Sequence, residues 1–112
     1  MDTLIERYRA AIKKIILDFA DEQPMMAEVT LEVVMDDERG HYEVLEVGWR
    51  GNKRVHNAII HIDLIGDKVW LQHDGTDLVI ADALTAAGIP VDSLVLGFRH
   101  PRVREYTGFA VA

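Results

Sequence analysis

Cysteine is absent from this sequence of 112 residues, which excludes disulfide bonds and any chemistry that depends on a thiolate. Serine occurs only at Ser93, and no histidine or acidic residue has the spacing from it that a hydrolase triad would show. The sequence also lacks a glycine-rich phosphate loop and any apolar run long enough to span a bilayer. Charged side chains interrupt residues 2–22, so we expect no signal peptide, no membrane association and a cytoplasmic location.

The residues that are present are typical of one globular domain. The composition is 49% hydrophobic and 28% charged, which predicts a single domain over residues 1–112 with a core of its own. The net charge is −7. Because lysine and arginine supply most of the affinity in non-specific DNA binding, this charge argues against strong DNA binding by the chain alone.

Residues 54–76 form the stretch around which the rest is organised. Two runs rich in β-branched residues, 54–65 and 68–73, flank Gly66-Asp67, a pair suited to a two-residue hairpin turn. The first run is apolar on both faces: one carries Ala58, Ile60, Ile62 and Leu64, and the other carries Val55, Ile59 and Ile65. This pattern predicts a central strand that is covered on both faces.

The residues before this hairpin predict one helix and two more strands. Apolar side chains recur at three- and four-residue spacings over residues 2–22, which is typical of an amphipathic helix, and either Asp2 or Thr3 can cap its start. Strands are predicted over residues 28–36 and 41–50, joined by an acidic turn that we interpret as solvated rather than calcium-binding. With the hairpin, these strands predict an antiparallel meander of four.

The residues after the hairpin predict a second helix over residues 77–87, with Thr76 as its N-cap and Gly88 in the left-handed position after its end. Residues 91–96 are either a turn of helix or a small fifth strand, and a short helix starts at Pro101. We expect the apolar residues 109–112 to pack down. The predicted fold class is α+β: an N-terminal helix, a four-stranded antiparallel meander sheet, then C-terminal helices with a possible short fifth strand.

Four polar residues near the hairpin are the best candidates for chemistry: His61, Asp63, Gln72 and Asp74. If the hairpin register joins their faces, they make a small pocket with an acid–base pair. The alternatives are a polar network that completes the hairpin end, or a polar seam in a dimer interface. The five histidines show no familiar metal-site spacing, so we expect no metal site and no cofactor.

One basic patch stands out near the C-terminal end of the sequence: Arg99, His100, Arg102 and Arg104. Such a cluster is suited to nucleic acid or to an acidic partner surface. The alternative interpretation is that these residues balance local acidic side chains such as Glu105.

Four segments carry a resemblance to a known family: VLEVGW (44–49), HIDLIGDKVWLQHDGT (61–76), IADALTAAGIPVDSLVLGFRHPRVREYT (80–107) and FAVA (109–112). The pattern KxWxQxDGT, the GIP turn, LGF and the closing FAVA together resemble the XisI family, the fdxN-element excision controlling factors of cyanobacteria. The resemblance covers nearly the whole chain. The sequence departs from the family pattern at Gly108, where an acidic residue is usual, and at Asp77-Leu78, where glutamate usually starts the helix.

The resemblance implies a small accessory protein rather than an enzyme. The family is associated with timed excision of a DNA element during heterocyst formation, where it acts beside a site-specific recombinase and a companion protein, XisH, that resembles a nuclease. No catalytic residues are assigned in the family, so none is transferred to this chain.

Three functional hypotheses follow. In the first, the chain forms a homo-oligomer or a complex with an XisH-like protein through an exposed sheet face or edge. In the second, it is a small-molecule-binding or catalytic domain that uses the four polar residues near the hairpin. In the third, it binds DNA directly through Arg99, Arg102 and Arg104.

Overall fold

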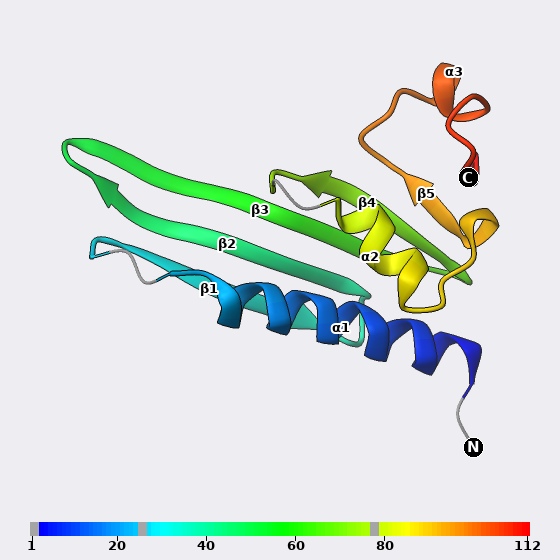
Figure 1. The fold of residues 1–112 in the computed structure, drawn as a ribbon, viewed down its shortest axis with the longest axis horizontal. Helices are drawn as coiled ribbons and strands as arrows, with labels where there is room; N and C mark the ends of the chain where they lie inside the picture. Colours follow the sequence, from blue (N-terminus) through cyan, green and yellow to red (C-terminus); the bar gives the residue numbers. More distant parts are fainter. Residues whose placement is uncertain (1–2, 25–26, 77–78) are drawn as a thin grey trace.

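The computed structural model describes residues 3–24, 27–76 and 79–112. Its elements in chain order are α1 (Leu4–Glu22), β1 (Val29–Asp36), β2 (His41–Arg50), β3 (Lys53–Ile65), β4 (Lys68–Asp74), α2 (Ile80–Ala86), the 3-10 turn η1 (Val91–Ser93), β5 (Leu94–Leu96) and α3 (Pro101–Arg104). The strands form one sheet in the order β1-β2-β3-β4-β5; β1 to β4 pair antiparallel, and β5 pairs parallel to β4 (Figure 1). The predicted α+β class, the meander and the short fifth strand are confirmed.

Helix α1 begins with a capping box, as its sequence predicts. The Thr3 hydroxyl accepts a hydrogen bond from the Glu6 amide at 3.1 Å, and the Glu6 carboxylate accepts one from the Thr3 amide at 3.2 Å. The alternative cap, Asp2, lies outside the described residues. Four side chains of the predicted apolar stripe are buried against the sheet: Tyr8, Ile12, Ile16 and Phe19. On the polar side of the helix, Lys13 pairs with Asp37 at 3.0 Å and ties α1 to the β1–β2 turn.

Strand β3 is central, as predicted, but the prediction that both of its faces are covered is wrong. A β-bulge leaves Ile59 without a partner in β2. The extra residue reverses which alternate side chains face the helices, so Val55 and Ile60 are buried on the same side despite their odd spacing. Ile65 is 51% exposed. The apparent second apolar face is therefore partly a product of the bulge.

Both α1 and α2 pack on one face of the sheet and contact each other (Figure 1). The core between these helices and the sheet contains the fully buried Tyr42, Ile62 and Leu84. Within the described residues no helix covers the opposite side of β1 to β3, which we term the open face. In the same part of the chain, no helix has the length and apolar character needed to cross a membrane.

Helix α2 starts differently from its prediction. Residues 77–78, the predicted first turn, lie outside the described residues. Thr76 is not the N-cap; that position is Val79, which makes no side-chain capping bond. The Asp74 carboxylate accepts hydrogen bonds from the Ile80 amide and from the Thr76 amide, each at 3.0 Å. Asp74 therefore satisfies the first amide of α2, that of Ile80, from the end of β4.

The chain after α2 returns to the sheet edge. Gly88 has a φ of +105° and ends α2 in the left-handed position, as predicted. Pro101 is the first residue of α3, a position whose N–H would have no partner within the helix, so proline is tolerated there. The Ala110 amide donates to the Leu94 carbonyl at 2.9 Å, and Phe109 packs against the core. The C-terminal residues thus pack down in part, although Val111 is exposed.

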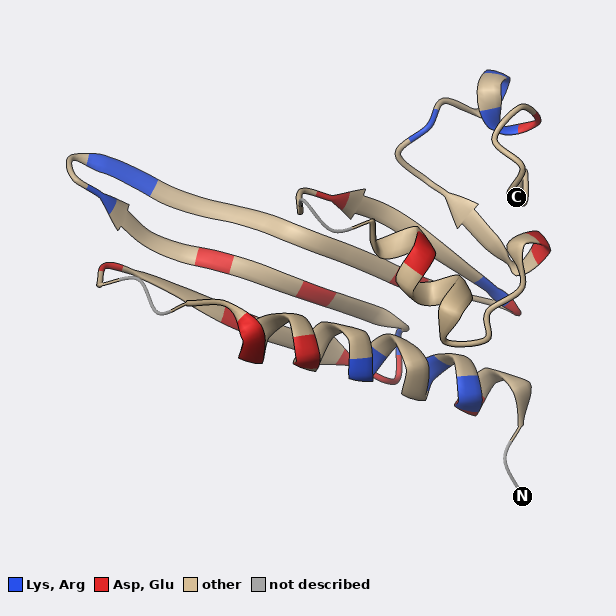
Figure 2. Cartoon of the chain, in the orientation of Figure 1, with Lys and Arg blue, Asp and Glu red and all other residues tan. Residues whose placement is uncertain are grey.

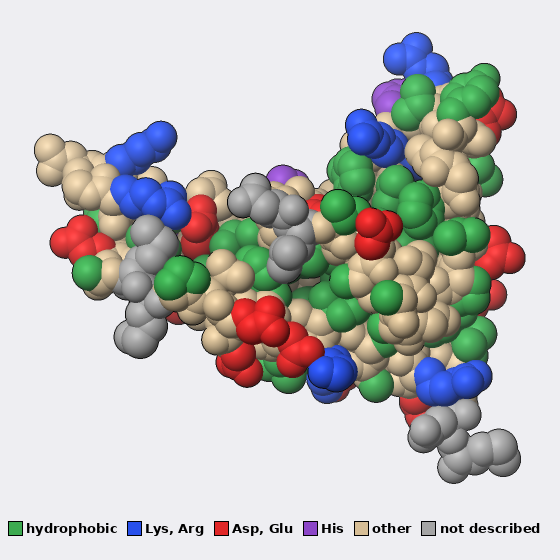
Figure 3. All heavy atoms as spheres, in the orientation of Figure 1, with side chains coloured by type: hydrophobic (Ala, Val, Ile, Leu, Met, Phe, Trp, Pro, Cys, Tyr) green, Lys and Arg blue, Asp and Glu red, His purple; other side chains and the backbone are tan. Residues whose placement is uncertain are grey.

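Charged groups are separated along the molecule (Figure 2). Apart from Glu6 in the first turn, the charged residues in the N-terminal part of α1 are basic and those in its C-terminal part are acidic, while further basic residues stand at the β2–β3 hairpin tip and at α3. On the helix-bearing face, acidic and apolar side chains separate the basic residues at the β2–β3 hairpin tip from those at α3 (Figure 3). The face shown therefore carries no continuous basic surface for a nucleic acid backbone.

Candidate functional site

A polar cluster lies on the open face, where β2, β3 and β4 run side by side. Residues directly opposite each other in paired strands share a face of the sheet. The register places His41 opposite Asp63 and Glu43 opposite His61. On the other side of β3, Asp63 is opposite Trp70 of β4. Strands β2 and β3 thus bring two imidazoles and two carboxylates to one place, beside β4.

Asp63 is the centre of this cluster and is only 6% exposed. Its Oδ1 lies 2.7 Å from Nδ1 of His41 and 2.7 Å from Nε2 of His61. Its Oδ2 accepts a hydrogen bond from Nε2 of Gln72 at 3.1 Å. The other ring nitrogen of His61 lies 3.6 Å from a carboxylate oxygen of Glu43. These contacts compensate for the desolvation of a buried carboxylate.

The electrostatics of the cluster favour a charged pair between Asp63 and His41. Burial alone raises the pKa of Asp63, but hydrogen bonds from His41, His61 and Gln72 together hold this pKa below its usual range. The hydrogen bond to Asp63 and the charge of its carboxylate raise the pKa of His41 above its usual value. The His41 side chain is 49% exposed, so the cluster is open to solvent on this side.

Removal of the Asp63 charge tests this coupling. In Asp63→Asn we expect the pKa of His41 to fall toward its ordinary value of 6.5, measured by NMR titration of the ring protons. In the unmodified protein the raised pKa means that protonated His41 stabilises the fold fully below about pH 6.5, and that this contribution is lost as the pH rises through the folded-state pKa. Because the pKa of Asp63 is lowered, ionised Asp63 also stabilises the fold, and this contribution is lost only as the pH falls through the folded-state pKa of Asp63. A variant at a distant carboxylate, Asp92→Asn, is the control; an unchanged pKa of His41 in Asp63→Asn would contradict the coupling.

The structure joins three of the four residues predicted for this cluster. His61, Asp63 and Gln72 are hydrogen-bonded to one another through Asp63. Asp74 is separate, because it is opposite Ile60, a fully buried residue that faces the helices. A second β-bulge, at Gln72, causes the separation by shifting the register between β3 and β4.

Sequence analysis missed His41 and Glu43, which complete the cluster from β2. A plain hairpin register between β2 and β3 would place His41 opposite Ile62, because Arg50 pairs with Lys53 at the turn. The bulge at Ile59 advances the register by one residue and brings His41 opposite Asp63 instead. No residue pattern in the strand marks that bulge.

The predicted basic patch lies on and just before α3. The His100 ring accepts a hydrogen bond from the Arg102 amide at 3.1 Å, so it caps the helix. The Arg104 guanidinium donates to the Arg99 carbonyl at 3.0 Å and lies 5.0 Å from the ring of Trp70. Within residues 79–112 as described, none of these arginines forms an ion pair with Glu105 or another acid.

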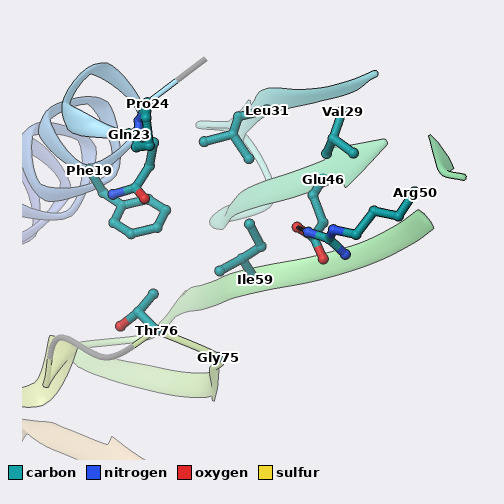
Figure 4. A pocket seen from close by; sticks show the side chains of 10 residues that line it. All are labelled: Phe19, Gln23, Pro24, Val29, Leu31, Glu46, Arg50, Ile59, Gly75 and Thr76. Carbon is teal, nitrogen blue, oxygen red and sulfur yellow. Dashed lines mark hydrogen bonds and ion pairs between the residues drawn. The ribbon is translucent and has the colours of Figure 1, made fainter. Parts of the chain in front are cut away.

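A second candidate site is a cleft of about 600 Å³ on the helix-bearing face (Figure 4). It opens between the end of α1, strands β1 to β3 and the end of β4, and its lining residues are Phe19, Gln23, Pro24, Val29, Leu31, Glu46, Arg50, Ile59, Gly75 and Thr76. Phe19, Leu31 and Ile59 supply apolar surface, while Glu46 and Arg50 pair at 3.1 Å. Such a cleft is suited to holding an apolar group rather than to acid–base chemistry.

The open face also carries an apolar strip next to the polar cluster. By register, the strip consists of Val34, Leu45, Val47, Trp49 and Ala58. Val34 is 40% exposed and Trp49 is 48% exposed, with the Arg54 guanidinium 5.4 Å from the Trp49 ring. Acidic side chains stand beside the strip on the same face, namely Glu32, Asp36 and Glu43. An exposed apolar patch with a polar rim is typical of a protein interaction site.

Comparison with known proteins finds similarity over nearly the whole chain. The sequence model of the XisI protein family matches residues 1–111. A crystal structure of a XisI-like protein from Anabaena variabilis ATCC 29413 is 34% identical, with a TM-score of 0.93 over 96% of this chain and 99% of that chain. The crystal structure of the fdxN element excision controlling factor XisI from the same organism is 35% identical, with a TM-score of 0.88 over 98% of this chain and 100% of that chain. No curated protein matches at a significant level.

Proposed function

The chain belongs to the XisI family, and we propose that it is a control factor in DNA-element excision that acts by binding another protein rather than by catalysis. Its similarity to the fdxN element excision controlling factor supports the link to excision. Its composition supports the mode of action, because a chain without cysteine, with one serine and with a net charge of −7 is suited neither to nucleophilic catalysis nor to binding DNA alone.

The open face is the observation that carries this proposal. Over the residues that the structure describes, α1 and α2 cover one side of the sheet, and the apolar strip lies on the other side. Trp49 is the largest side chain in the strip, and its ring is held by Arg54 on the next strand. Aromatic side chains of this kind supply much of the binding energy in protein interfaces.

The partner that we propose for this face is an XisH-like protein, the nuclease-like companion that the family resemblance implies. A protein that handles DNA carries a basic surface for the phosphate backbone. An acidic chain with Glu32, Asp36 and Glu43 beside its apolar strip is complementary to such a surface. In this scheme the chain controls the recombinase indirectly, through the complex.

Co-purification tests the proposal. The chain and the XisH-like protein encoded with it are expressed together, purified through a tag on the partner, and measured by light scattering at two salt concentrations. We expect one stoichiometric complex that weakens at the higher salt concentration, because complementary charges contribute to it. The same measurement on the chain alone is the control.

Two other results would overturn the choice of partner. If the two proteins elute separately, an XisH-like protein does not occupy the open face. If the chain alone is a dimer and stays one in the presence of the partner, a second copy covers the apolar strip and the homo-oligomer is the functional unit.

A further inference from the structure

The three central side chains of the polar cluster have the composition of a metal site. One ring nitrogen of His41, one ring nitrogen of His61 and one carboxylate oxygen of Asp63 all lie within 4.8 Å of one another. Both nitrogens converge on the same oxygen, each at 2.7 Å. Two imidazoles and one carboxylate, with further positions open, form a ligand set that divalent transition metals use.

The residues around these three groups hold them as the outer partners of metal ligands do. A metal-bound histidine usually donates its second N–H to a carboxylate, which fixes the ring and its tautomer. A carboxylate stands where such a partner is needed for His61, because Glu43 lies 3.6 Å from its Nδ1, within ion-pair distance, while its Nε2 points at Asp63. The second oxygen of Asp63 is fixed by Gln72 at 3.1 Å. The cluster therefore has both an inner and an outer layer of contacts.

Donor counting leaves room for an ion between His61 and Asp63. A neutral imidazole has one N–H and can donate from one nitrogen only. The two nitrogens of His61 face two different carboxylates, Glu43 and Asp63. Both carboxylates are satisfied either by a second ring proton or by an ion at Nε2, and the ion leaves the Nδ1–H for Glu43.

We propose that His41, His61 and Asp63 bind one divalent transition-metal ion, with Zn²⁺ the preferred occupant and water in the open position. Calcium and magnesium are poor candidates, because they prefer oxygen ligands and this set offers two nitrogens. The half-exposed His41 gives the ion a route from solvent.

The fit requires a small outward movement. Bonds of about 2.0–2.2 Å to a tetrahedral ion place two ligand atoms about 3.4 Å apart, so each nitrogen must move away from the Asp63 oxygen by about 0.7 Å. The His41 ring has room to move outward by this distance, because its side chain is 49% exposed and is not part of the core. Asp63 stays in place because it is buried and bonded to Gln72.

The experiment uses the full chain, treated with EDTA and dialysed, and two probes: ZnCl₂ by calorimetry and CoCl₂ by visible absorption. We expect one equivalent of Zn²⁺ per chain, a rise in the unfolding temperature, and cobalt bands typical of a site with nitrogen and oxygen ligands. His41→Gln is expected to abolish the cobalt bands. Glu43→Gln is expected to weaken Zn²⁺ affinity by about 10- to 100-fold, as the loss of an outer partner does elsewhere.

Two exposed histidines outside the cluster provide matched controls. His56→Gln and His100→Gln remove side chains of the same type from exposed positions and are expected to bind metal like the unmodified protein. The folding of all variants is compared by circular dichroism. Of the three proposed ligands His41 is the most exposed, so His41→Gln is expected to disturb the fold less than replacement of His61 or Asp63. Binding of clearly less than one equivalent overturns the proposal, and so does equal loss in His41→Gln and His56→Gln, which would indicate adventitious binding to surface histidines.

Discussion

Replacement of Gly40 by alanine is expected to destabilise the folded protein by about 2–5 kcal/mol, the sum of a left-handed backbone and a steric clash. Gly40 has a φ of +74° at the end of the β1–β2 turn. An added Cβ would meet the main-chain carbonyl of Leu64 on β3. The Leu64 amide in turn donates to the Gly40 carbonyl at 2.8 Å, so the two segments cannot separate without the loss of that bond.

Urea unfolding of matched variants measures this effect. Gly51 also has a positive φ, +62°, but an added Cβ there meets no atom within 4 Å. Gly51→Ala is therefore expected to lose only the backbone contribution, about 1–2 kcal/mol. If both variants lose the same free energy of unfolding, the close approach of the β1–β2 turn to β3 is not as tight as described.

Truncation of Trp49 is expected to reduce affinity for the XisH-like partner by about 30- to 700-fold, which corresponds to the 2–4 kcal/mol of an interface hot spot. Trp49 is 48% exposed at the end of the apolar strip, so its replacement by alanine leaves the core intact. The ring is also preorganised by Arg54, which reduces the entropy lost on binding. Calorimetric titration of Trp49→Ala against the partner gives the affinity.

A side chain of similar exposure on the other side of the molecule is the control. Leu17 is 45% exposed on α1, which packs on the helix-bearing face. Leu17→Ala is expected to bind the partner as the unmodified chain does. An equal loss of affinity in the two variants would place the partner elsewhere or indicate a general loss of folding.

Simple periodicity of apolar residues correctly predicted the elements in which no bulge interrupts the pattern, such as β1 and α1. In β1 the side chains of Val29 and Val33 face the core as the two-residue period requires, and Glu32 faces away. In α1 the stripe that ends at Phe19 faces the sheet, as its three- and four-residue spacings indicate. The resemblance to the XisI family, based on segments within residues 44–112, is confirmed by the family match over residues 1–111.

The two β-bulges were beyond sequence analysis, and they determine the site. The bulge at Ile59 brings His41 opposite Asp63, where a regular register would place His41 opposite Ile62, and it also contributes to the apparent second apolar face of β3. The bulge at Gln72 sends Asp74 to the helix-bearing face, where it caps α2. A one-residue shift of register reverses every side chain beyond it, so a prediction that assumes regular strands loses the cluster from that point on.

Hydroxyl-radical footprinting of the chain with and without the XisH-like partner tests the central claim most directly. Three exposed aromatic side chains report on different surfaces: Trp49 on the open face, and Phe98 and Tyr106 near α3. If the open face is the docking surface, oxidation of Trp49 falls sharply in the complex while Tyr106, which is 79% exposed, reacts as before. If Trp49 is oxidised at an unchanged rate while Phe98 and Tyr106 become protected, the partner binds around α3 and the open face is not its site.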